Sequence, residues 1–90
     1  MGMRTAKNLL YHTWIGLRVK VMRSSARQLE GMEGRIVDET KNLIVMERGE
    51  KEVRIPKVAC RFRFFLEDGS HTDVDGSKIA FRPEERAKKV

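Results

Sequence analysis

The 90-residue sequence has one cysteine and two histidines, and these shortages exclude several kinds of site. Cys60 cannot form an intramolecular disulfide or a zinc site by itself, which suits a reducing compartment. His12 and His71 have no second histidine, cysteine or carboxylate at a spacing that would complete a zinc or hydrolase site. We therefore expect no catalytic residue, no metal and no cofactor in this chain.

Long apolar runs are also missing. No stretch approaches the roughly 20 apolar residues that cross a membrane. The first twelve residues lack the apolar run and small-residue cleavage site of a secretory signal. A chain of this length forms one domain with a small core. We expect a single domain over residues 1–90, a cytoplasmic location and no membrane contact.

Positive charge is present in excess, and its distribution is uneven. The net charge is +6 and the sequence pI is about 9.9. Residues 1–30 carry six basic side chains against one acid, whereas residues 31–90 carry thirteen against twelve. A charge-rich surface selected for thermal stability would explain the balanced part but not the one-sided N-terminal third. The excess instead indicates a polyanionic partner.

The hydrophobic pattern has the period of β-strands. Leu17, Val19 and Val21 alternate with Arg18 and Lys20, which predicts a half-buried strand with a basic outer face. Turn signals then separate short strand-like runs, and residues 24–30 read as a loop or a helical turn. The pattern predicts an all-β fold, a small antiparallel barrel of about six strands. The remaining strand-like runs are residues 31–40, 43–47, 51–55, 61–64, 71–74 and 77–81.

Helical signals are confined to the two ends. Thr5 is a suitable N-cap for a short helix over residues 5–12, and Pro83 suits the first turn of a C-terminal helix. The predicted organisation is an N-terminal helical extension over residues 1–15, a β-barrel over 16–81 and a C-terminal helical tail over 82–90.

Residues 61–65 alternate arginine with phenylalanine before a second phenylalanine follows. This spacing suits a base-stacking platform, but a small domain needs Phe62 and Phe64 in its core, and we favour the core. Arg61 and Arg63 would then be available to phosphates on the opposite face. We also expect Cys60 to be a buried structural thiol. The two glycines of residues 31–34 favour a bulge or a close backbone approach over a phosphate-binding loop.

Several segments together resemble archaeal ribonuclease P protein component 1, the counterpart of a subunit of eukaryotic ribonuclease P and ribonuclease MRP. The match covers roughly residues 8–86, and its most specific part is GMEGRIVDETKNL at 31–43 followed by IPK at 55–57. Shorter matches are HTWIGL at 12–17, VKV at 19–21, VDG at 74–76 and RPE at 82–84. The resemblance implies a six-stranded Sm/SH3-like barrel with terminal helices.

The resemblance also implies a function. It implies a non-catalytic, RNA-binding subunit of ribonuclease P, whose RNA removes the 5′ leader of precursor tRNA. The implied partners are the specificity domain of that RNA, a zinc-ribbon protein subunit and, indirectly, precursor tRNA. We expect the free chain to be a monomer.

Two properties select the candidate residues for RNA and for the protein partner: the charge of a residue and the face of the predicted strand on which it lies. For the protein partner we select the apolar residues Leu9, Leu10 and Trp14, since tryptophan is a typical interface anchor. In the alternative, this segment folds back on the barrel. For RNA we select first Arg18, Lys20, Arg23 and Arg27, then Lys41, Asn42, Lys57, Arg61 and Arg63, and from the tail Arg82, Arg86, Lys88 and Lys89.

Three other interpretations stay open at this point. An Sm-like ring would bind uridine-rich single strands, but the sequence has no matching pair of Sm motifs. A ribosomal or chromatin-type basic barrel would bind ribosomal RNA or duplex DNA. A nuclease would need converging carboxylates or a histidine for metal or proton transfer, whereas the acids here fall largely in turns and on strand exteriors.

Overall fold

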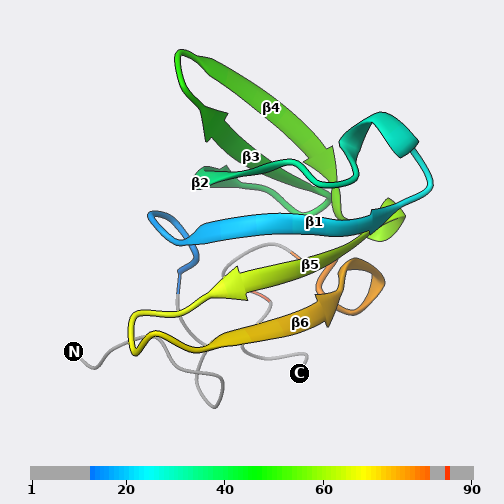
Figure 1. Cartoon of the computed structure of the whole chain (residues 1–90). Coiled ribbons are helices and arrows are strands. Elements are labelled where there is room, and N and C mark those ends of the chain that lie inside the picture. Colours follow the sequence, from blue (N-terminus) through cyan, green and yellow to red (C-terminus); the bar gives the residue numbers. More distant parts are fainter. Residues whose placement is uncertain (1–12, 82–84, 86–90) are drawn as a thin grey trace.

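The computed structural model describes residues 13–81 and residue 85 (Figure 1). Its six strands form one antiparallel sheet in the order β4-β3-β2-β1-β5-β6. The predicted all-β fold is therefore confirmed. The strands are β1 (Arg18–Ser24), β2 (Glu33–Glu39), β3 (Leu43–Arg48), β4 (Lys51–Pro56), β5 (Cys60–Phe65) and β6 (His71–Asp75).

Short 3-10 turns lie between or after the strands: η2 (Arg27–Leu29), η3 (Lys57–Ala59) and η4 (Gly76–Lys78). Residues 24–30 were predicted to be a loop or a helical turn, and the structure has the helical turn η2 there. The strand predicted over residues 77–81 is wrong, because the chain enters η4 there and Asp75 Oδ1 accepts a hydrogen bond from the Ser77 N–H at 3.0 Å. The predicted terminal helices, over residues 5–12 and from Pro83, lie outside the described residues except at Glu85.

One hydrophobic core contains side chains from five strands. Phe62 and Phe64 are fully buried in it, as predicted, and Cys60 is a buried free thiol. The cluster joins residues from both sides of the sheet, Ile55 of the edge strand β4 with Phe62 and Phe64 of β5, so the sheet curls around it as in a small barrel. The buried members of the cluster are Trp14, Leu17, Val19, Val21, Ile36, Ile44, Met46, Ile55, Cys60, Phe62, Phe64, Leu66 and Ile79.

A β-bulge in β1 sets the direction of Arg23. Val19 and Val21 face the core, so strict alternation would turn residue 23 inward as well. The register with β5 shifts between Val21 and Arg23, where β1 contains an extra residue. Arg23 is thereby opposite Arg61, and both are exposed on the outer face.

A second bulge, in β2, has the opposite effect on Glu39. Ile36 faces the core, so strict alternation would turn residue 39 outward. The register with β3 shifts between Ile36 and Asp38, and Glu39 is then opposite the buried Ile44. Glu39 is only 7% exposed, so the bulge directs a carboxylate into the interior.

The carboxylate of Glu39 meets the buried ammonium group of Lys57. Lys57 Nζ donates to Glu39 Oε2 at 2.8 Å, to Thr40 O at 2.7 Å and to Phe81 O at 3.0 Å. These acceptors satisfy all three ammonium hydrogens. Nζ also lies 5.4 Å from the centroid of the Trp14 ring. The prediction that Lys57 contacts RNA is wrong, because its side chain is fully buried in this network.

Trp14 also belongs to the interior. Its side chain is fully buried, and its ring centroid lies 4.9 Å from that of Phe64. The prediction that Trp14 anchors a protein partner is wrong, because a buried indole leaves no area for another chain. The alternative, packing back on the barrel, is what the structure shows for this residue. The other two predicted partner residues, Leu9 and Leu10, lie outside the described residues.

Candidate nucleic-acid interface

Side chains cross the outer face of the sheet in rows, because residues opposite each other on antiparallel strands point to the same side. The first row passes from β2 through β1 to β5, with Arg18 between Arg35 and Phe65. It continues to His71 on β6. Neighbouring strands lie about 4.8 Å apart, so adjacent members of a row are close enough to contact one ligand.

Two further rows also include a cation of β1. Lys20 lies between Glu33 of β2 and Arg63 of β5, and Arg23 lies beside Arg61. We call the six cations of the three rows the basic face; they are Arg18, Lys20, Arg23, Arg35, Arg61 and Arg63. Five of the six were predicted RNA contacts, so the structure brings together five of the nine predicted residues that it describes. Arg35 is the member that we did not predict.

Strand β6 places acids beside the second and third rows. Asp73 is opposite Arg63, and Asp75 is opposite Arg61. Arg63 donates from Nε to Asp73 Oδ1 at 2.8 Å and from Nη2 to Asp73 Oδ2 at 3.1 Å. This side-chain hydrogen bonding lowers the pKa of Asp73 below its usual value. Acids of β6 therefore offset charge along two rows, whereas the first row has His71 at the β6 position. The acids beside the first row are Glu47 of β3, opposite Arg35, and Glu33 of β2, which pairs with Arg18.

Replacing Asp73 with asparagine is expected to increase affinity for RNA by roughly two- to fivefold at low salt. An exposed ion pair is worth up to about 1 kcal/mol, and its loss frees the Arg63 guanidinium for phosphate. The measurement is fluorescence anisotropy with a labelled RNA duplex. The matched control is Asp68→Asn, because Asp68 is exposed and accepts hydrogen bonds from Ser70. An equal increase in both variants would mean that net charge alone acts.

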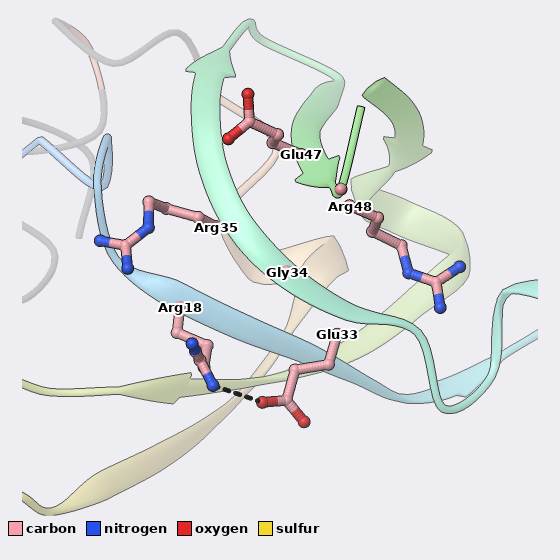
Figure 2. Close-up of a pocket in the computed structure, with 7 residues that line it drawn as sticks. Arg18, Glu33, Gly34, Arg35, Glu47 and Arg48 are labelled. Carbon is pink, nitrogen blue, oxygen red and sulfur yellow. Dashed lines mark hydrogen bonds and ion pairs between the residues drawn. The ribbon is translucent and has the colours of Figure 1, made fainter. Parts of the chain in front are cut away.

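A hollow lies at the β2 and β3 side of the first row (Figure 2). Arg18 Nη1 lies 3.4 Å from Glu33 Oε2, and Arg35 Nη1 donates to the carbonyl oxygen of Gly16 at 3.1 Å. The side chain of Arg18 is 59% exposed, so its pair with Glu33 is weak and a phosphate can displace it. The lining residues are Arg18, Glu33, Gly34, Arg35, Glu47, Arg48 and Gly49.

Gly34 keeps this part of the sheet tightly packed. A Cβ atom at this position would overlap the carbonyl oxygen of Glu47 and the side chain of Met46. The close backbone approach predicted for residues 31–34 is therefore confirmed at Gly34. Gly31 has a φ of 84°, which residues with side chains rarely adopt.

Apart from Lys57, the remaining residues predicted to contact RNA lie away from the three rows or outside the described residues. Arg27 is exposed in η2, and Lys41 and Asn42 are exposed in the turn between β2 and β3. The residues predicted from the tail, Arg82, Arg86, Lys88 and Lys89, lie outside the described residues.

Of the residues that line the hollow, only Arg18 was predicted from the sequence to contact RNA, and the two cations that were missed are Arg35 and Arg48. Arg35 precedes the buried Ile36, so alternation alone would have placed it on the outer face. Arg48 ends β3 and enters the site only because the β3–β4 hairpin lies beside β2, and no local sequence signal indicates that.

The described residues contain no group of three or more His, Cys, Asp or Glu side chains that could hold a metal ion. Within the same residues, no helix is long and apolar enough to span a membrane. Burial raises the pKa of the Cys60 thiol, which donates to Ser24 Oγ at 3.3 Å. A raised thiol pKa leaves little reactive thiolate at neutral pH.

The fold is a small antiparallel barrel with cations in rows across neighbouring strands. These features are typical of one class of protein, the basic β-barrels that bind the phosphate backbone of a nucleic acid. Comparison with known proteins makes the assignment more specific. The family described as ribonuclease P/MRP, subunit p29 matches residues 7–89. The chain therefore belongs to the ribonuclease P/MRP subunit p29 family.

Curated relatives carry the name ribonuclease P protein component 1. The protein of Pyrococcus abyssi is 41% identical over 98% of this chain and 68% of its own length. The protein of Methanothermobacter thermautotrophicus is 40% identical over 97% of this chain and 95% of its own length. A solved structure, described as a homologue of the human RNase P protein Rpp29, is 39% identical and has a TM-score of 0.64, covering 83% of this chain and 97% of that one. These findings confirm the resemblance and the barrel fold.

Proposed function

We propose that this chain acts in ribonuclease P by holding the folded RNA of the enzyme on its basic face. The observation that carries the proposal is the juxtaposition of Arg18, Lys20 and Arg23 on β1 with arginines of β2 and β5. Family membership supports the assignment to ribonuclease P, and the rows of cations support a polyanionic ligand.

The basic face suits an RNA that is recognised by its shape rather than by its base sequence. Guanidinium groups have planar donor sets that match phosphate oxygens, and five of the six cations are arginines. Structured RNA presents phosphates and 2′-hydroxyl groups, whereas its deep major groove hides the base edges. Contacts of this kind fix the position and orientation of an RNA without reading its sequence. The catalytic RNA would perform the cleavage. This chain would stabilise the folded RNA and the binding of substrate to that RNA.

The proposal extends to the other partners. We propose that the chain pairs with a zinc-ribbon subunit, that the pair binds the specificity domain of the RNA, and that precursor tRNA is contacted indirectly. The resemblance to archaeal ribonuclease P protein component 1 supports these partners. Leu9 and Leu10 remain the proposed protein contacts, and Ile15, which is 49% exposed, provides an apolar side chain at the same end of the chain. We propose a cytoplasmic location and a monomeric free chain.

Reconstitution tests the proposed function directly. The enzyme is assembled from its RNA and protein subunits with and without this chain, and the RNA is footprinted in both states. We expect protection of backbone positions in the specificity domain and a lower magnesium requirement for cleavage of precursor tRNA when the chain is present. Unchanged footprints would contradict the proposal, as would cleavage of precursor tRNA by the polypeptide alone.

A further inference from the structure

The third phenylalanine of β5, Phe65, lies on the outer face. It is opposite the exposed residues Arg18 and His71, whereas Phe62 and Phe64 are fully buried. Phe65 itself is partly exposed. The rings of Phe65 and His71 are in contact, with centroids 6.4 Å apart and planes inclined at 59°. The inner and outer faces of β5 therefore carry aromatic rings with different surroundings.

The charge around Phe65 differs from that around its neighbours on β5. Arg63 and Arg61 are opposite Asp73 and Asp75 of β6, so an approaching phosphate meets carboxylates there. Phe65 has no such acid opposite it on β6. On its other side the row continues to Arg18 and then to Arg35. The aromatic ring is thus bordered by Arg18, whose exposed pair with Glu33 is the nearest acid contact in the row, and by His71.

We propose that Phe65 and Arg18 form a stacking site for an unpaired RNA base, with the adjoining phosphates held by Arg18 and Arg35. The inference rests on the proposed function, because it assumes that RNA lies on the basic face. Aromatic rings and guanidinium planes both stack on the π-face of a base, whatever the base is. Bases inside a duplex are already stacked on one another, so the site selects a single-stranded loop, bulge or end.

The matched substitutions are Phe65→Leu, which keeps apolar volume and removes the ring, and Phe65→Tyr, which keeps the ring. The full-length chain is titrated with two labelled probes, a 12-nucleotide single strand of adenosines and a 24-base-pair RNA duplex. Stacking contributes about 1–3 kcal/mol per base, so we expect Phe65→Leu to weaken binding of the single strand by roughly 5- to 150-fold. Binding of the duplex should change by less than about twofold, and Phe65→Tyr should bind both probes like the unaltered chain.

The outcomes separate this inference from the proposed function. If Arg18→Gln weakens both probes while Phe65→Leu changes neither, the basic face binds RNA and the stacking site is refuted. If the unaltered chain binds neither probe, the proposed function is refuted as well. A loss of duplex binding in Phe65→Leu equal to the loss of single-strand binding would also refute base stacking.

A second measurement does not depend on the folding of a variant. In NMR spectra of the unaltered chain, a stacked adenine should move the Phe65 ring protons upfield, whereas the Phe62 ring protons should hardly move because that ring is buried. The duplex should leave the Phe65 ring protons close to their free positions. Phe65 ring shifts that are equal with the two probes would overturn the proposal.

Discussion

Replacing Lys57 with methionine is expected to lower the free energy of unfolding by about 3–5 kcal/mol, which is a large part of the stability of a small domain. Methionine keeps much of the side-chain volume but removes the ammonium group. Three acceptors then lose their donor, among them the buried carboxylate of Glu39 and the carbonyl oxygen of Phe81. Chemical denaturation of the full-length chain measures the change.

Two companion variants identify the cause. Lys51→Met removes a lysine from an exposed position of β4 and should change stability by less than about 0.5 kcal/mol. Combining Lys57→Met with Glu39→Met removes both buried charges, and we expect it to recover most of the loss because no unpaired ion remains. If the double variant is as unstable as the single one, packing and the carbonyl contacts, rather than the ion pair, account for the effect.

Neutralising Arg18, Lys20 and Arg23 together, each as glutamine, is expected to weaken RNA binding on the order of 100-fold at low salt, from roughly 1 kcal/mol per contact. The plot of log affinity against log salt should become shallower by about 2–3, because each phosphate contact contributes roughly 0.7–0.9 to its slope. The measurement is a salt titration of binding to the ribonuclease P RNA.

A matched triple variant shows whether position or total charge matters. Lys51, Arg54 and Lys78 are exposed cations outside the three rows, and their replacement by glutamine removes the same charge. We expect this variant to keep most of the affinity and nearly the full salt slope. Equal losses in the two triple variants would mean that RNA is attracted by net charge rather than held on the basic face.

The inner and outer faces of the sheet were largely predictable from alternation. Leu17, Val19 and Val21 are buried and Arg18 is exposed, as their spacing predicts. Alternation fails where an extra residue enters a strand. The bulge that turns Arg23 outward depends on pairing with β5, which is distant in sequence, and the bulge that turns Glu39 inward depends on the register with the next strand, β3. No local pattern indicates either bulge.

Lys57 and Trp14 were misplaced for a related reason. A lysine is almost always exposed unless a partner is buried with it, and Glu39 is 18 positions away in the sequence. A tryptophan near a chain end equally suits an interface and a core. Tertiary contacts decide both cases: Lys57 is enclosed between the β2–β3 turn and the segment after η4, while Trp14 packs on Phe64. Only a structure shows such contacts.

The contacts of Lys57 also affect the entropy of binding a ligand that contacts the barrel near both Trp14 and Phe81. One ammonium group touches the carbonyl oxygen of Phe81 and lies over the ring of Trp14, so the first and last parts of the barrel meet at the same point. A ligand that contacts both of these parts therefore does not have to bring them together. The conformational entropy of bringing two distant chain segments together is lost when the domain folds, not when the ligand binds.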